Sequence, residues 1–212
     1  EEKELYDAVT GYLTKKKEEA SETRNIHVSL ALTVMQRRLV SSIFAIKNTL
    51  ERRWMALQGI VDEVNKNPDL WNKRHKLDGF DVDNIEEYEE LDDDERDALD
   101  NILSDPRKFK LFTTAKSIQE IQTEANEVKK LFEMAQTLYN RKQEEKKFQE
   151  LQELLRSQGV LENGEKLVIF TEHKDTLLYL EERLTKSGGY KVATIHAEKT
   201  SMTGEKLNGL LR

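Results

Sequence analysis

One stretch near the C-terminal end decides the fold class that we expect: residues 164–177, with the sequence GEKLVIFTEHKDTL. Its apolar run, 167–170, is typical of a buried parallel strand. A polar turn and an amphipathic helix pattern follow and run on to Leu184. Residues 190–198, YKVATIHAE, predict a second strand. Strand, helix and strand in this order predict a β–α–β unit with parallel strands.

The residues ahead of this unit have the apolar spacing of helices. We expect a first helix before the polar stretch 18–25, then helices over 26–39, 43–64 and 106–140, and a short one over 147–155. The apolar seams of 43–64 and 106–140 have heptad-like spacing. These two helices are therefore predicted to pack antiparallel as a hairpin arm.

Capping residues and prolines indicate where the longer helices begin and end. Ser41 or Ser42 is expected to cap the third helix. That helix should end before Pro68, because the residue ahead of a proline is pushed out of the helical region. Asp105 is expected to cap the fourth helix, with Pro106 at its first position.

Together these patterns predict an α+β fold that is mostly α. Residues 1–144 would form a long-helix hairpin or bundle, with an acidic connection at about 66–105, and residues 145–212 a partial α/β unit. The composition suits long exposed helices, since 37% of the residues are hydrophobic and 35% are charged. Average proteins have roughly 45–50% and 25%. Two Pro and nine Gly also leave few helix breakers.

The chain has no features of a secreted or membrane protein. It contains no Cys, which excludes disulfides and thiolate metal sites. It has no run of about 18 apolar residues, and its acidic N-terminus is not a signal peptide. We therefore expect a soluble, cytoplasmic protein with no membrane partner.

Charge is distributed unevenly along the chain, whose net charge is −7. The stretch 81–105 holds thirteen acidic residues and one Arg, so the rest of the chain is net positive. Phosphate contact by the rest is electrostatically possible. The acidic stretch is interpreted as a solvated insertion, with mimicry of nucleic acid as the alternative.

Several catalytic chemistries have no motif in this sequence. It has no Gly-x-x-x-x-Gly-Lys-Ser/Thr loop for nucleotide phosphates and no Gly-x-Ser-x-Gly elbow. Its four His have no paired metal-ligand spacing. We expect no catalytic residue, no metal and no cofactor in this chain, and no ATP hydrolysis by the chain alone.

The strand ending in Phe170-Thr171, the helix after it and a second strand ending in Ile195-His196 resemble a known arrangement. They are similar to the opening of the second RecA-like lobe in helicase-like ATPases of superfamily two, nearest to bacterial RapA-like members of the Swi/Snf-related group. The Lys-x-x-x-Leu-x-x-Leu-Leu pattern over 147–155 resembles the helix that opens that lobe. Residues 31–42 resemble a block between the two lobes.

This resemblance implies a fragment of an ATP-dependent DNA translocase, spanning the interlobe helical region and the start of lobe two. It would provide a helical arm and part of the DNA track. The implied partners are double-stranded DNA and the first RecA-like lobe. The parent would need ATP and Mg²⁺, but the phosphate loop, the Mg²⁺-binding acids and the arginine finger of the family have no counterpart here.

The resemblance also implies nucleic-acid-binding residues, namely Thr171, Lys174, His196, Lys199 and Ser201. The first two lie at a helix N-terminus, whose free N–H groups favour phosphate. Helix capping by Thr171 or Asp175, a structural His196 and an N-cap at Ser201 are the alternatives. Where the family has Gly after the histidine, this chain has Ala197, which puts close backbone contact in doubt.

Arg37 and Arg38 are candidates for bracing the two lobes or touching DNA, with a solvated basic helix face as the alternative. Trp54 and Trp71 are interpreted as packing residues, because neither lies in an aromatic and basic cluster. The rival function is a non-enzymatic helical scaffold or protein-interaction module with a small α/β cap.

Overall fold

The computed structural model describes residues 1–23, 25–69, 99, 102–103, 105, 113–141, 145–164, 166–187 and 190–195. The chain divides into two compact units, Glu1–Glu145 and Lys146–Arg212.

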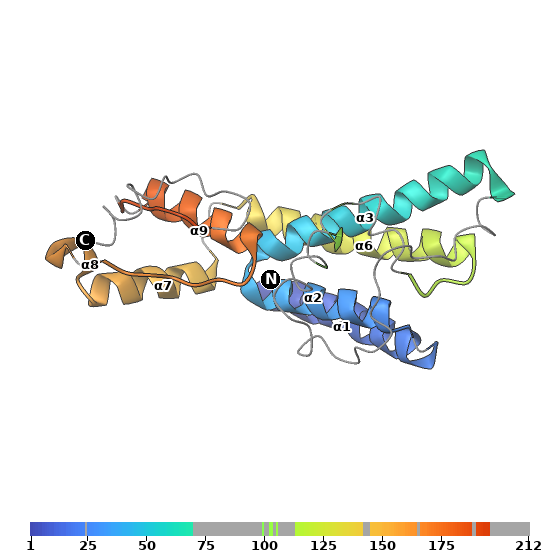
Figure 1. Ribbon diagram of the computed structural model, residues 1–212, viewed down its shortest axis with the longest axis horizontal. Coiled ribbons are helices and arrows are strands. Elements are labelled where there is room, and N and C mark those ends of the chain that lie inside the picture. The colour runs from blue at the N-terminus through green and yellow to red at the C-terminus, as the bar shows by residue number, and fades with distance from the viewer. Residues whose placement is uncertain are drawn as a thin grey trace. The chain divides into compact units, whose positions relative to one another are not determined.

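The first unit is a bundle of long helices (Figure 1). Its helices are α1 (Glu2–Glu22), α2 (Ile26–Ser41), α3 (Ile43–Lys66) and α6 (Ile118–Tyr139). Helix α1 packs on α2, α2 on α3, α3 on α6, and α6 returns to α1. The bundle therefore closes on itself around one hydrophobic core.

The predicted pairing of the two seam helices is confirmed: α3 and α6 run antiparallel and share the largest contact of the bundle (Figure 1). Leu50 and Leu57 of α3 and Val128 of α6 are fully buried in the shared seam. Trp54 stacks on Phe132 with ring centroids 5.9 Å apart. The prediction that Trp54 is a packing residue is also confirmed, while Trp71 lies outside the described residues.

The start of α3 has the cap expected from the sequence. The Ser42 hydroxyl accepts a hydrogen bond from the Ala45 N–H at 3.0 Å, which satisfies one free donor of the first turn. The helix ends at Lys66, and its C-cap Asn67 lies directly before Pro68. Both predicted boundaries are confirmed.

The predicted start of the fourth helix is wrong. Asp105 lies in a bend, residues 113–117 are not helical, and α6 begins at Ile118; residues 106–112 lie outside the described part. Ser117 Oγ accepts from the Glu120 N–H at 3.2 Å, while Glu120 Oε2 accepts from the Lys116 N–H at 2.7 Å. These two bonds satisfy the N–H groups of Glu120 and Lys116, on either side of the helix start, so the helix begins at Ile118.

The acidic stretch contributes to the core at two described positions. Leu99 and Leu103 are helical and fully buried. At these residues the stretch is anchored to the bundle.

The second unit contains α7 (Lys146–Ser157), α8 (Val160–Asn163) and α9 (Lys174–Ser187). The helix expected over 147–155 is thus confirmed as α7. Phe148 of α7 meets Tyr179 of α9 edge to face, with ring centroids 5.9 Å apart. Gly159 and Gly164 flank α8 with φ near +60°, a conformation that a residue with a Cβ rarely adopts.

The predicted parallel strands are absent from the described residues, so the α+β prediction with a RecA-like α/β unit is wrong. Residues 166–170 and 191–195 have no strand or bridge, and every regular element that the structure describes is a helix. Leu167, Val168, Ile169 and Phe170 are all exposed, Phe170 by 91%.

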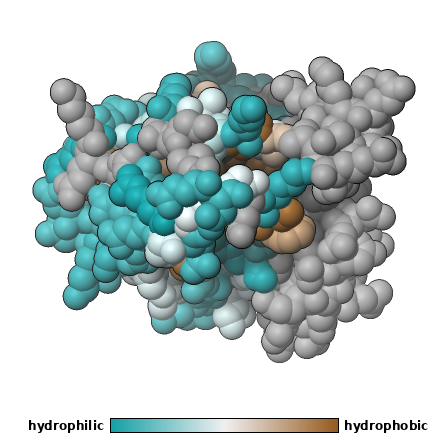
Figure 2. Space-filling model, turned by 90° about the vertical axis from the view of Figure 1, so that its left-hand side faces the viewer, coloured by the Kyte–Doolittle hydropathy of each residue, from teal (hydrophilic) through white to brown (hydrophobic). Residues whose placement is uncertain are grey.

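Residues 166–170 form no strand because the described part of the chain gives them no neighbouring strand. An inner parallel strand needs strands on both edges and cover on both faces, and the described residues supply neither to 166–170. Figure 2 shows brown, hydrophobic residues at the surface among hydrophilic ones. The apolar run therefore remains exposed.

Candidate functional site

The residues predicted to bind nucleic acid are only partly described. Thr171 is half-buried in the connection ahead of α9, and Lys174 is the exposed first residue of that helix. The backbone bond from Leu177 N–H to His173 O, 3.0 Å, fixes the start of the helix, so Lys174 lies in the first turn and Thr171 three residues ahead of Lys174. His196, Lys199 and Ser201 lie outside the described residues.

The two candidate brace residues on α2 differ in their surroundings. Arg37 is half-buried, whereas the Arg38 side chain is inside the bundle and only 1% exposed. Arg38 Nη1 donates to the Thr49 hydroxyl on α3 at 2.8 Å. Arg38 therefore joins α2 to α3 within the first unit and is not on a solvated basic face.

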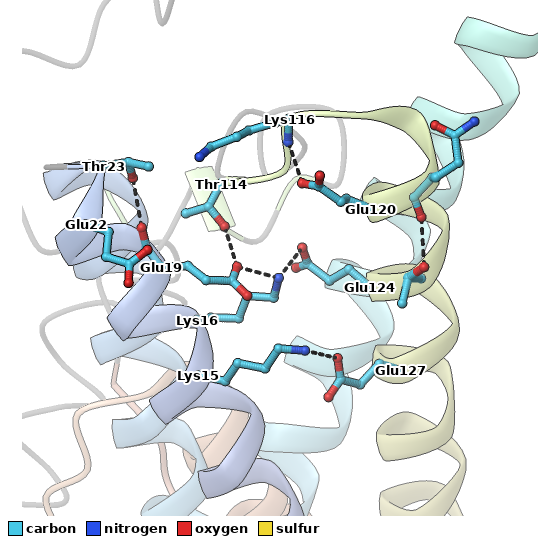
Figure 3. Close-up of a pocket in the computed structure, with 12 residues that line it drawn as sticks. Lys15, Lys16, Glu19, Glu22, Thr23, Thr114, Lys116, Glu120, Glu124 and Glu127 are labelled. Carbon is cyan, nitrogen blue, oxygen red and sulfur yellow. Dashed lines mark hydrogen bonds and ion pairs between the residues drawn. The ribbon is translucent and has the colours of Figure 1, made fainter.

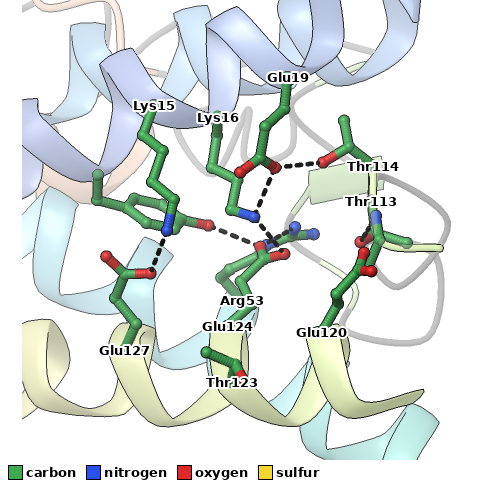
Figure 4. Close-up of polar contacts among 12 residues, drawn as sticks. Lys15, Lys16, Glu19, Arg53, Thr113, Thr114, Glu120, Thr123, Glu124 and Glu127 are labelled. Atoms are coloured by element: carbon green, nitrogen blue, oxygen red, sulfur yellow. Dashed lines mark hydrogen bonds and ion pairs between the residues drawn. The ribbon is translucent and has the colours of Figure 1, made fainter. Parts of the chain in front are cut away.

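The most organised polar group of the described residues was not predicted from the sequence. It is a buried ion-pair cluster made by Tyr12 and Lys16 of α1, Arg53 of α3 and Glu124 of α6 (Figure 4). We call these four residues the Glu124 cluster. Glu124 has a side chain that is 1% exposed, and the Arg53 side chain is 3% exposed.

Glu124 receives a partner from each of two other helices. Its Oε1 accepts hydrogen bonds from the Tyr12 hydroxyl at 2.9 Å and from Arg53 Nη2 at 2.5 Å. Lys16 Nζ lies 3.3 Å from its Oε2. One carboxylate thus connects α1, α3 and α6 in the interior of the bundle.

Further polar contacts extend the cluster toward the surface (Figure 3). Lys16 Nζ also contacts Glu19 Oε2 at 2.8 Å, and the Thr114 hydroxyl donates to the same oxygen at 2.8 Å. They line a hollow of about 370 Å³ between α1 and the start of α6. At its other end, the exposed pair Lys15–Glu127 is 3.8 Å apart.

Electrostatics keep the carboxylate of the cluster charged. Burial alone would raise the pKa of Glu124, but the charges of Arg53 and Lys16 outweigh it and lower that pKa below the ordinary value. For Lys16, burial opposes the charged form, but the Glu124 carboxylate and the Glu19 hydrogen bond raise its pKa. The charged forms of both partners are therefore favoured.

The tyrosine is held in its neutral form. Burial raises the pKa of Tyr12 well above the ordinary value, and the Glu124 charge raises it further. A tyrosine that stays protonated beside a carboxylate that stays ionised has no proton to exchange near neutral pH. The Glu124 cluster is thus suited to hold helices together and not to acid–base catalysis.

The described residues contain no group of three or more His, Asp and Glu residues that could hold a metal ion. Among the described helices, none has the length and apolar character needed to cross a membrane.

The signal that could have revealed the cluster is a pair of opposite charges on two apolar seams. Arg53 occupies the inward phase of α3 between Leu50 and Leu57, and Glu124 lies beside Ile121 and Ala125 on the buried face of α6. In the sequence, each of the two residues is a charged side chain at a position where the seam is otherwise apolar. Only the register between α3 and α6 shows that the two charged residues face each other.

Comparisons with protein-family models, with curated proteins and with solved structures found no match.

Proposed function

We propose that this chain is part of a helicase-like ATPase of the Swi/Snf-related group, acting in the cytoplasm. In it, the helical unit Glu1–Glu145 serves as a rigid arm with no catalytic residues of its own. The resemblance of residues 147–155 and 166–184 to that group supports the assignment. The observation that carries the arm's role is the Glu124 cluster, which ties three helices together through one buried carboxylate.

An arm that transmits movement between domains must resist internal sliding of its helices. A buried ion pair provides such resistance, because separating its partners leaves a desolvated charge uncompensated, at about 3–5 kcal/mol. Helix α3, with 24 residues, gives the arm a length of about 36 Å at 1.5 Å per residue. ATP and Mg²⁺ would bind elsewhere in the complete protein, whose first RecA-like lobe is a further expected partner.

Double-stranded DNA is the proposed ligand of the second unit, through the first turn of α9. Lys174 is exposed at the N-terminus of this 14-residue helix, and Thr171 lies three residues ahead of it. The positive end of a helix dipole and an exposed lysine beside it attract phosphate. His196, Lys199 and Ser201 stay predictions for the same contact.

Binding of labelled duplexes of different sequence by the 212-residue chain tests this proposal at low salt. Lys174→Ala should weaken binding equally for all duplexes and reduce the slope of log affinity against log salt by about 0.9. Lys186→Ala is the matched control, since Lys186 is exposed at the other end of α9. Equal effects of the two variants on affinity and slope would reject DNA contact at the first turn.

The second candidate is a non-enzymatic scaffold that binds other proteins through the helical unit. Exposed apolar side chains favour it: Val40, Met55 and Met134 are 55%, 53% and 37% exposed. The gene sequence on either side of the chain separates the two candidates. A phosphate-binding loop upstream and an arginine-bearing motif downstream favour the ATPase, and the absence of both favours the scaffold.

A further inference from the structure

The second unit has an apolar segment that the described residues leave without cover. Figure 1 shows residues 166–173 as a stretched connection between α8 and α9. Leu167, Val168, Ile169 and Phe170 are 54%, 66%, 40% and 91% exposed. Successive side chains of a stretched chain point to opposite sides. Four exposed residues in a row therefore leave both sides of the segment open.

The segment also has the composition of a strand. Residues 166–172 read KLVIFTE, with neither Gly nor Pro and with one charge of each sign at the two ends. Val, Ile, Phe and Thr favour strands, and short segments with low net charge and high strand propensity associate with copies of themselves. The exposed edge of such a segment is a template for another chain.

We propose that residues 166–172 pair with the same residues of a second copy of this chain, as two antiparallel strands centred on Ile169. This interface is independent of the DNA contact proposed above. It is isologous, so the same residues contribute from each copy and the contact closes as a dimer.

The charges at the two ends of the segment indicate that its partner is a second copy of the chain, paired in the register centred on Ile169. In the pairing centred on Ile169, Lys166 of each chain lies opposite Glu172 of the other, so both ends are closed by opposite charges. Between them, Val168 lies opposite Phe170, an aromatic and β-branched pair of the favourable kind. Each favourable pair occurs twice, because the arrangement is two-fold.

The neighbouring registers lack this match. A shift of one residue in one direction places Glu172 opposite Glu165, and a shift in the other direction places it opposite Leu167. A parallel, in-register pairing would place Lys166 opposite Lys166 and Glu172 opposite Glu172. Like charges directly opposite each other are destabilising, so the end charges specify the antiparallel register.

A short two-stranded ribbon buries little surface, and we therefore expect a weak, concentration-dependent dimer. Sedimentation equilibrium of the full chain at up to about 1 mM reveals a dissociation constant of that order. Lys166→Glu and Glu172→Lys should each weaken the dimer at least several-fold, since each creates two like-charge contacts. The double variant K166E/E172K should restore the original dissociation constant.

Lys186→Glu serves as the control, because Lys186 lies outside the segment at the far end of α9, and it should leave the dimer unchanged. A chain that stays monomeric at 1 mM overturns the proposal. So does a dimer that the two single reversals leave intact, or one that the double variant fails to restore.

Single cysteines report the direction of pairing, since the chain has none of its own. Val168→Cys chains mixed with Phe170→Cys chains of a different tagged size should form mainly mixed disulfides on mild oxidation. A predominance of disulfides within each variant would indicate parallel pairing and overturn the proposed register.

Discussion

The two units of this chain differ in whether their most apolar residues are buried. In the first unit the seams of α3 and α6 are buried against each other, and even charged residues such as Arg53 and Glu124 lie inside. In the second unit the most apolar run, 167–170, is exposed to solvent. A helix makes its hydrogen bonds within itself and needs only one neighbour for its apolar face. A strand makes its backbone hydrogen bonds to another strand and therefore needs a partner along at least one edge.

The largest loss of stability in the first unit is expected when the buried Glu124 carboxylate is removed. Glu124→Ala should lower the free energy of unfolding by about 3–5 kcal/mol, because the buried Arg53 loses the carboxylate that compensates its charge. Glu127→Ala, one turn away and partly exposed, should change it by about 0–1 kcal/mol. Urea denaturation measures both, and equal effects would show that the buried charge has no special role.

A charge placed in the apolar seam should have a slightly smaller effect. Val128 is fully buried between α3 and α6. Val128→Asp should cost about 3 kcal/mol, because it buries an unpaired carboxyl group in the seam. Thermal unfolding followed by circular dichroism measures the loss. An unchanged melting temperature would mean that the antiparallel pairing of α3 and α6 is wrong.

Acid should weaken the first unit through the same carboxylate. Because the folded pKa of Glu124 is below the ordinary value of 4.5, its stabilisation is complete above that pH and is lost as pH falls through the folded pKa. Urea titrations between about pH 7 and pH 3 should show this loss for the wild type. In Glu124→Gln the fall should be shallower. Identical pH profiles would contradict the lowered pKa.

The smallest effect is expected in the second unit. Phe170 is 91% exposed, so Phe170→Ser should change stability by no more than about 0.5 kcal/mol. The same aromatic-to-polar change at Phe148, which is 2% exposed, provides the contrast and should be clearly destabilising. If Phe170→Ser destabilises as much as Phe148→Ser, the segment is covered and the comparison between the two units fails.

Local signals predicted most of the helical unit correctly. Ser42 caps α3 and Pro68 follows its end, as the sequence indicated. The predicted start of the helix at Asp105-Pro106 is too early: Ser117 and Glu120, which have the spacing of a capping box, lie at the start of α6. Both kinds of signal act within one turn of a helix and can be read from neighbouring residues.

Long-range features could not be predicted in the same way. The strand prediction for 167–170 rested on its apolar residues, but strand formation also needs edge partners that the run itself does not reveal. The Glu124 cluster joins residues 71 positions apart in the case of Arg53 and 112 in the case of Tyr12. Such contacts depend on the register between helices, which seam spacing alone does not fix.

The most direct test of the rigid arm is native-state hydrogen exchange on the Glu124→Gln variant, helix by helix. If the Glu124 cluster ties α1 to α3 and α6, the amides of α1 should exchange much faster in the variant. The amides of α3 and α6 should lose less protection, because their apolar seam remains. Unchanged protection of α1, or an equal loss in α1, α3 and α6, would contradict the account.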